Sequence, residues 1–176
     1  MNRPVVFVVM DGIGLSENTV GNAVKEAYTP TLDTLMNNIP YTTIQAHGVA
    51  VGLPSDDDMG NSEVGHNAIG CGQIYAQGAK LVNQSLESGE IFTSDTWNKT
   101  MAQAQNSTLH FIGLLSDGNV HSHIDHLIAM VKQAKLSGVK RVRSHILLDG
   151  RDVPATSGLI YVEQLENVFR ELNDDD

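Results

Sequence analysis

Apolar runs along the chain predict strands that alternate with helices. Three runs end at or directly before an aspartate: Val5–Met10 (VVFVVM), residues 108–116 (TLHFIGLLS) and residues 139–149 (VKRVRSHILLD). The first of these is a continuous apolar run rich in valine, which is typical of a strand that is buried on both faces of a sheet. The sequence therefore predicts three strands, the last of them strongest at its final apolar residues.

Helical spacing separates these runs. Thr29-Pro30 begins one helical pattern, since proline is favoured at the first position of a helix. Two later patterns repeat apolar residues on one helical face: Ile124, Leu127, Ile128, Val131 and Ala134, with Gly138 as a C-terminal cap, and then Leu159, Val162, Leu165, Phe169 and Leu172. This alternating order of strands and helices implies that the strands pair in parallel through right-handed crossovers. The predicted fold class is α/β, with layers that contain a parallel sheet and helices on its faces.

Polar clusters directly follow the predicted strands. They comprise Asp11-Gly12, Asp117–His123 and Asp149–Asp152. In open α/β sheets, ligands bind beyond the carboxyl ends of the strands. Asp-Gly pairs are also common in plain turns, so any one cluster alone fits a turn. Three such clusters with histidines and an arginine beside them favour a binding site.

Composition excludes several classes of partner. The net charge of the 176-residue chain is -10, which argues against nucleic acid or an anionic membrane as the main partner. No apolar run approaches the roughly 20 residues that a membrane span needs. The single cysteine, Cys71, excludes an internal disulfide framework and fits a reducing compartment such as the cytosol. The terminal NDDD is interpreted either as a solvated tail or as a point where a longer chain continues.

The stretch DDDMGNSEVGH, residues 56–66, carries the most unusual chemistry. Ser62 precedes a predicted helix, so it is either an N-cap or a hydroxyl placed where helix N-termini bind anions. His66 follows one turn later and is expected to be a core histidine. Cys71 lies among small residues and is expected to be a small buried hydrophobe.

Two later motifs leave alternatives open. VHSHIDH holds His121, His123 and His126, but it lacks the paired Cys or His-Glu framework that is typical of zinc sites. A zinc site there remains one interpretation. Arg151 and Asp152 either form a local ion pair, or Arg151 binds a carboxylate or phosphate through its fork of donors.

Four motifs together resemble one enzyme family. MDGIG, GLPSDDDMGNSEVGHNAIGCG, LLSDGNVHSHIDHL and LLDGRDVP occur in order between Met10 and Pro154. In this they resemble the cofactor-independent (2,3-bisphosphoglycerate-independent) phosphoglycerate mutases, which belong to the alkaline-phosphatase-like metalloenzymes. The resemblance covers nearly the whole chain.

The resemblance implies a reaction and its residues. The reaction interconverts 2-phosphoglycerate and 3-phosphoglycerate, in glycolysis and gluconeogenesis, through a phosphoserine at Ser62. Asp11 and Ser62 match ligands of one of two divalent metal ions, usually manganese, with magnesium or cobalt as alternatives, and no 2,3-bisphosphoglycerate is required. His121, Arg151 and Asp152 match positions that hold the phosphoglycerate, and Asp152 is the best candidate for proton transfer at a hydroxyl.

The resemblance also implies a chain in two parts. Residues 1–76 match the N-terminal part of a metal-binding phosphatase-like domain, and residues 77–176 match the front part of the phosphotransferase domain that holds the substrate. Family members are much longer, with further metal ligands and substrate arginines in their later segments. The intact enzyme is expected to be a cytoplasmic monomer that acts on a small-molecule phosphoglycerate. Two alternatives remain: a truncated, inactive fragment, and a metal-dependent phosphatase of the same superfamily, against which the VHSH and DGRD motifs count.

Overall fold

The computed structural model describes residues 3–174. The chain forms two compact units, Met1–Ile44 (unit 1) and Gln45–Asp176 (unit 2), and each is described by itself. Unit 1 contains two short helices, α1 (Ala23–Glu26) and α2 (Pro30–Asn38). Proline is the first residue of α2, as Thr29-Pro30 predicts. The helix that the sequence predicts from this motif is therefore confirmed.

The predicted strand at Val5–Met10 is absent from the structure. Its apolar side chains are exposed, from 47% at Val9 to 94% at Val5. A parallel strand needs a neighbouring strand for its backbone hydrogen bonds, and the described residues of unit 1 contain no second strand. The apolar run has the composition of a strand, but without a partner strand the prediction is wrong for this structure.

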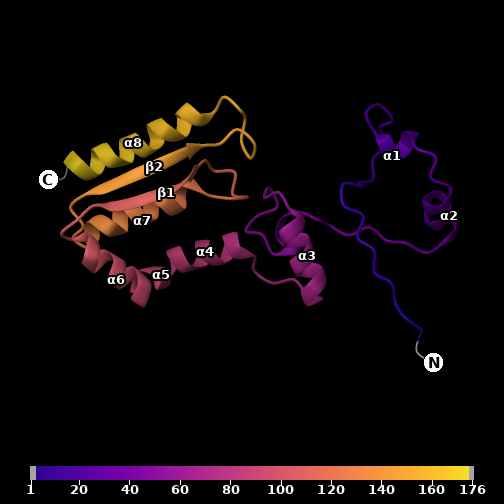
Figure 1. Ribbon diagram of the computed structural model, residues 1–176, viewed down its shortest axis with the longest axis horizontal. Coiled ribbons are helices and arrows are strands. Elements are labelled where there is room, and N and C mark those ends of the chain that lie inside the picture. The colour runs from indigo at the N-terminus through magenta and orange to yellow at the C-terminus, as the bar shows by residue number, and fades with distance from the viewer. Residues whose placement is uncertain (1–2, 175–176) are drawn as a thin grey trace. The chain divides into compact units, whose positions relative to one another are not determined.

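Unit 2 begins with a succession of helices and then alternates strands with helices in its C-terminal part (Figure 1). Its elements are η1 (Gly48–Val51), α3 (Ser62–Cys71), α4 (Gly78–Glu87), α5 (Glu90–Thr93), α6 (Asp95–Ala104), β1 (Leu109–Leu115), α7 (Ile124–Leu136), β2 (Val142–Leu148) and α8 (Gly158–Asp174). β1 and β2 are parallel, with a register from Leu109↔Val142 to Leu115↔Leu148. The predicted α/β class and the parallel pairing are confirmed.

One face of the β1–β2 sheet carries the core. Two clusters of buried side chains pack there: the first joins α6, β1 and α7 around Trp97, Met101 and Leu109, and the second joins α7 and α8 around Leu115. Figure 1 shows α7 and α8 running alongside the two strands. Gly138 follows α7 with a φ of 82°, a left-handed conformation that glycine adopts without strain. The predicted helical faces of α7 and its C-terminal glycine are thus confirmed.

The opposite face of this sheet is exposed. Ile112 and Leu147 point to that side by strand alternation, and they are 79% and 56% exposed. A parallel sheet usually has both faces covered, but among residues 3–174 this second face leaves Ile112 and Leu147 mostly exposed.

The helices give no indication of a membrane span. Among residues 3–174, no helix is both long enough and apolar enough to cross a bilayer.

Candidate active site

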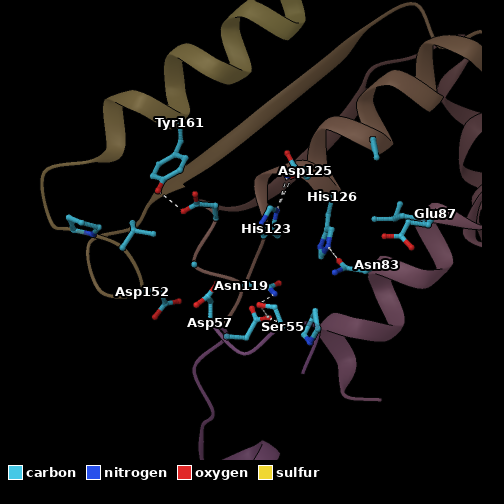
Figure 2. Close-up of a pocket in the computed structure, with 18 residues that line it drawn as sticks. Ser55, Asp57, Asn83, Glu87, Asn119, His123, Asp125, His126, Asp152 and Tyr161 are labelled. Carbon is cyan, nitrogen blue, oxygen red and sulfur yellow. Dashed lines mark hydrogen bonds and ion pairs between the residues drawn. The ribbon is translucent and has the colours of Figure 1, made fainter. Parts of the chain in front are cut away.

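A cleft of about 850 Å³ opens beside the carboxyl ends of β1 and β2 (Figure 2). The loops that follow the two strands line it together with the 54–58 loop and parts of α4, α7 and α8. Six carboxylates line the cleft, from Asp57, Asp58, Glu87, Asp117, Asp125 and Asp152. No lysine or arginine of the described residues is among its lining side chains. The position agrees with the rule for open α/β sheets, but an acidic cleft of this kind does not by itself attract an anion.

Ser116 and Asp149 tie the two strand ends together. They follow Leu115 and Leu148, the last pair in the sheet register, and the Ser116 hydroxyl donates to Asp149 Oδ2 at 2.6 Å. Asp149 Oδ1 accepts hydrogen bonds from the backbone N–H groups of Gly150, Arg151 and Asp152 at 2.7, 2.9 and 3.1 Å. These hydrogen bonds lower the pKa of Asp149 to about 2, and the bond from Ser116 contributes most. The ionised carboxylate therefore fixes the backbone of the DGRD loop.

The lowered pKa makes a prediction about acid stability. Asp149 has a lower pKa in the folded chain than in the unfolded chain, where it is about 4. Its charge therefore stabilises the fold above about pH 4, and this contribution is lost as the pH falls through about 2. We expect Asp149→Asn to lower the free energy of unfolding at pH 6, with a difference from wild type that shrinks steadily toward pH 2.

Urea unfolding across this pH range measures that difference. Ser116→Ala removes the largest cause of the lowered pKa, so the acid-induced loss of stability should be smaller in this variant and should be complete at a higher pH. A difference between Asp149→Asn and wild type that stays constant from pH 6 to pH 2 would contradict the assignment.

His121 and Asp152 meet across the two loops. His121 Nδ1 lies 2.7 Å from Asp152 Oδ2, with the His121 side chain 55% exposed and that of Asp152 only 7% exposed. Asp152 lines the main cleft, whereas His121 lines a smaller adjoining cavity. The structure thus brings together two of the three residues that were predicted to hold the substrate.

Arg151 lies apart from that pair. Its backbone N–H is held by Asp149, but its side chain is exposed. Among residues 3–174 no ion pair joins Arg151 to Asp152, because the Asp152 carboxylate pairs with His121 instead. The alternative of a local Arg151–Asp152 ion pair is therefore wrong, and the guanidinium remains available to a ligand.

The N-cap of α3 is Asn61, not Ser62. The Asn61 side chain accepts a hydrogen bond from Val64 N at 3.0 Å, and Ser62 is the first residue of the helix. Ser62 is exposed, and its hydroxyl lies 3.1 Å from His66 Nδ1, whereas Asn61 holds the backbone N–H of Val64. The cap interpretation of Ser62 is wrong because an asparagine one residue earlier satisfies the same backbone donor.

His66 is exposed rather than part of the core, so that expectation is wrong. Its Nδ1 lies 2.7 Å from the Ser62 carbonyl oxygen and 3.1 Å from the Ser62 hydroxyl. A carbonyl oxygen only accepts, so Nδ1 carries the proton in this arrangement. An Nδ1 that donates cannot also take a proton from the Ser62 hydroxyl. His66 is therefore not a general base for Ser62 in this geometry.

Several other sequence expectations can be compared with the structure. Cys71 is exposed, so its predicted burial is wrong. His123 Nδ1 accepts from Asp125 N at the start of α7, and His126 Nε2 pairs with Asn83 Oδ1. Burial and the neighbouring His123 lower the pKa of His126. Residues 3–174 contain no group of three or more His, Cys, Asp or Glu side chains arranged to hold a metal ion, which argues against the zinc interpretation.

Asp11 lies in unit 1, and Ser62 lies in unit 2. Asp11 Oδ1 accepts a hydrogen bond from Gly12 N at 3.0 Å, as in an ordinary Asp-Gly turn. The expected approach of Asp11 and Ser62 to one metal ion stays a prediction, as does the domain boundary near Gln77.

Asp58 and Asn119 were missed by sequence reasoning. Asn119 Nδ2 donates to Asp58 Oδ1 at 2.6 Å, across 61 residues of chain. Burial raises the pKa of Asp58, but the hydrogen bonds from Asn119 and Ser55 lower it by more. The sequence did show a run of three carboxylates and an Asp-Gly-Asn turn, but no local pattern pairs the two segments.

Comparison with known proteins assigns the chain to a family. The family model "BPG-independent PGAM N-terminus" matches residues 82–175, more than half of the chain. The chain belongs to the cofactor-independent phosphoglycerate mutases.

Individual proteins that are similar to this chain support the family assignment. A probable 2,3-bisphosphoglycerate-independent phosphoglycerate mutase of Leptospira interrogans is 51% identical over 97% of this chain and 32% of its own length. The corresponding mutase of Zea mays is also 51% identical, over 97% of this chain and 31% of its own length. The phosphoglycerate mutase of Leishmania mexicana, solved at low cobalt concentration, superposes with a TM-score of 0.85 at 44% identity and covers 95% of this chain and 31% of its own. The chain thus spans about a third of the length of these mutases.

Proposed function

We propose that this chain supplies part of the active site of a cofactor-independent phosphoglycerate mutase, which interconverts 2-phosphoglycerate and 3-phosphoglycerate. The observation that carries the proposal is the His121–Asp152 pair at the carboxyl ends of two parallel strands. Asp149 fixes the loop that presents this pair. The pair and its loop belong to the VHSH and DGRD motifs, which favour a mutase over a phosphatase of the same superfamily.

In this proposal Ser62 is the nucleophile. Its Oγ attacks phosphorus, the bond between phosphorus and the substrate oxygen breaks, and the glycerate hydroxyl oxygen leaves with the electron pair. Ser62 is exposed at the first turn of α3, where the helix N-terminus favours an incoming phosphate. The return step reverses these changes on the other hydroxyl of the retained glycerate.

Proton transfer at the glycerate hydroxyls is assigned to Asp152. In the first transfer the Ser62 hydroxyl loses its proton and the leaving glycerate oxygen gains one, and in the return transfer the attacking glycerate hydroxyl loses a proton and the Ser62 oxygen regains one. His121 occupies one carboxylate oxygen of Asp152, which leaves the other oxygen for a hydroxyl of the substrate. His121 and Arg151 bind the phosphoglycerate, Arg151 through its exposed guanidinium.

The residues of this chain fit part of a divalent metal site. The Asp11 carboxylate and the Ser62 hydroxyl are oxygen donors, which suit manganese or magnesium. Bound cations would lower the pKa of the serine hydroxyl and offset the charge of the phosphoryl group. Two donors do not complete two coordination spheres of about six ligands each, so this chain alone holds at most part of the site.

Charge also limits what the 176 residues do alone. Phosphoglycerate is a strongly anionic substrate, whereas the cleft offers six carboxylates and no lining lysine or arginine among the described residues. The net charge of the chain is -10. We also propose, from the family resemblance, that the intact enzyme is a cytoplasmic monomer with residues 1–76 in its phosphatase-like domain and residues 77–176 in its substrate domain. The chain by itself is the inactive fragment.

A comparison of two proteins tests this proposal. A coupled mutase assay with added manganese should detect turnover only when the chain is extended to the length of its relatives. Ser62 of the 176-residue chain should remain unmodified in mass spectra after incubation with manganese and 3-phosphoglycerate. Phosphorylation of Ser62 in the short chain would contradict the inactive-fragment assignment. An extended protein that releases inorganic phosphate but forms no 2-phosphoglycerate would favour the phosphatase.

A further inference from the structure

Two sets of hydrogen bonds attach the Ser62 segment to the rest of unit 2. The first is at Gln77, which is 4% exposed. Its side chain donates to the carbonyl oxygen of Val51 at 3.0 Å, and its backbone N–H donates to that of Gly52 at 2.9 Å. The second is the hydrogen bond between Asp58 and Asn119, which joins the loop before Ser62 to the loop after β1.

The Asp58 end of this second attachment is firmly held. Asp58 Oδ2 accepts from both the backbone N–H and the hydroxyl of Ser55, at 2.7 and 2.8 Å. Its backbone carbonyl oxygen accepts from Gly48 N at 3.1 Å. Its backbone N–H also donates to Ser55 O at 3.3 Å, so four hydrogen bonds hold Asp58 on its own segment and its remaining oxygen, Oδ1, accepts from Asn119 in a fixed direction. Figure 2 shows Asn119 and Ser55 at this side of the cleft.

The Asn119 end is equally constrained. Asn119 has a φ of 57°, a left-handed conformation that asparagine tolerates better than most residues, and its N–H donates to Ser122 O at 3.1 Å. Gly118 packs against Asp152 so closely that an added Cβ would lie 2.5 Å from the Asp152 Cβ. The tip of this loop therefore contacts Asp58 on one side and Asp152 on the other.

We propose that Asp58 and Asn119 are positioning residues that hold the segment carrying Ser62 against the loop carrying His121. The inference rests on the proposed function for the roles of Ser62 and His121. Ser62 follows Asp58 by four residues, and a chain of that length spans at most about 14 Å. Fixing Asp58 on Asn119 therefore confines the nucleophile to the neighbourhood of the His121–Asp152 pair.

The Asp58–Asn119 hydrogen bond adds no charge to the acidic cleft. The Asn119 amide binds the Asp58 carboxylate as a neutral donor, whereas a lysine or arginine at this position would bring a positive charge. Asp57 and His123 also lie near Asp58, and His123 helps to lower its pKa. The interaction is also directional, because asparagine donates and aspartate accepts.

This direction allows a swap experiment on the 176-residue chain. Asn119→Asp places a carboxylate against the Asp58 carboxylate and removes the donor. The double variant Asp58→Asn/Asn119→Asp restores the bond in the opposite sense, since the amide introduced at position 58 can donate to the carboxylate introduced at position 119 and still accept from Ser55. Aspartate also tolerates the left-handed backbone at this second position. Asp57→Asn is the matched control, because it removes a neighbouring cleft carboxylate for which the described structure shows no hydrogen bond.

Residual dipolar couplings of backbone N–H groups provide the measurement. In the wild-type chain and in Asp57→Asn, α3 should share one alignment tensor with α7. In Asn119→Asp the couplings of α3 should shrink and no longer fit that tensor, while those of α7 should persist. The double variant should regain the common tensor, which a purely destabilising substitution would not do.

Three results would overturn the proposal: separate tensors in the wild type, unreduced α3 couplings in Asn119→Asp, or no recovery in the double variant. Because no substrate is present, these results do not depend on whether the intact protein is a mutase. A failed mutase assay would leave the couplings unchanged, so the two proposals fail separately.

Discussion

Ser62→Ala is expected to abolish mutase turnover in the intact enzyme and to leave the stability of unit 2 almost unchanged. The loss should be complete, because the reaction proposed here passes through a covalent bond to the Ser62 oxygen. Cys71 cannot replace it, since it lies at the far end of α3. Stability should hold because Asn61, and not Ser62, caps the helix.

Asn61→Ala is the matched control for this variant. It removes the cap and should cost about 1 kcal/mol of unfolding free energy. Turnover at saturating 3-phosphoglycerate and urea unfolding, measured on both variants, separate the two roles of adjacent residues. Residual mutase activity in Ser62→Ala, above a mock preparation, would exclude the phosphoserine route. Equal losses of stability in the two variants would contradict the cap assignment.

Periodicity alone predicted the part of the fold that is locally encoded. The apolar runs and the helical faces of α7 and α8 identify β1, α7, β2 and α8, because burial against one sheet face needs those spacings. The clusters after β1 and β2 follow from the same logic. The contact of His121 with Asp152 agrees with the expectation that loops at one sheet edge lie together.

Predictions from the sequence failed, or could not be made, where the outcome depends on distant parts of the chain. Val5–Met10 has the composition of a buried strand, but a strand exists only with a partner. Ser62 and Asn61 both have capping side chains, and local sequence does not decide between neighbours. Asp58 and Asn119 are joined by tertiary structure across 61 residues, so no spacing rule could pair them.

Arg151→Ala is expected to weaken binding of 3-phosphoglycerate by the intact enzyme about 10- to 100-fold. A hydrogen bond to a charged group contributes about 1.5–3 kcal/mol to the binding free energy. The Arg151 side chain is exposed and forms no ion pair with Asp152, so its loss should not disturb the His121–Asp152 pair. Isothermal titration calorimetry measures the change. Arg143→Ala is the control, since Arg143 is exposed on β2, away from the cleft lining.

The same substitution should also change the products. After the first transfer, glycerate must stay bound until it receives the phosphoryl group on its other hydroxyl. An enzyme that has lost its carboxylate anchor should release glycerate, so water would hydrolyse the phosphoserine more often. We expect Arg151→Ala to raise the ratio of inorganic phosphate released to 2-phosphoglycerate formed, with Arg151→Lys intermediate because lysine keeps the charge but not the two-pronged geometry. Weaker binding with an unchanged product ratio would place Arg151 on the phosphate rather than on the carboxylate of the substrate. Unchanged binding would remove it from the site altogether.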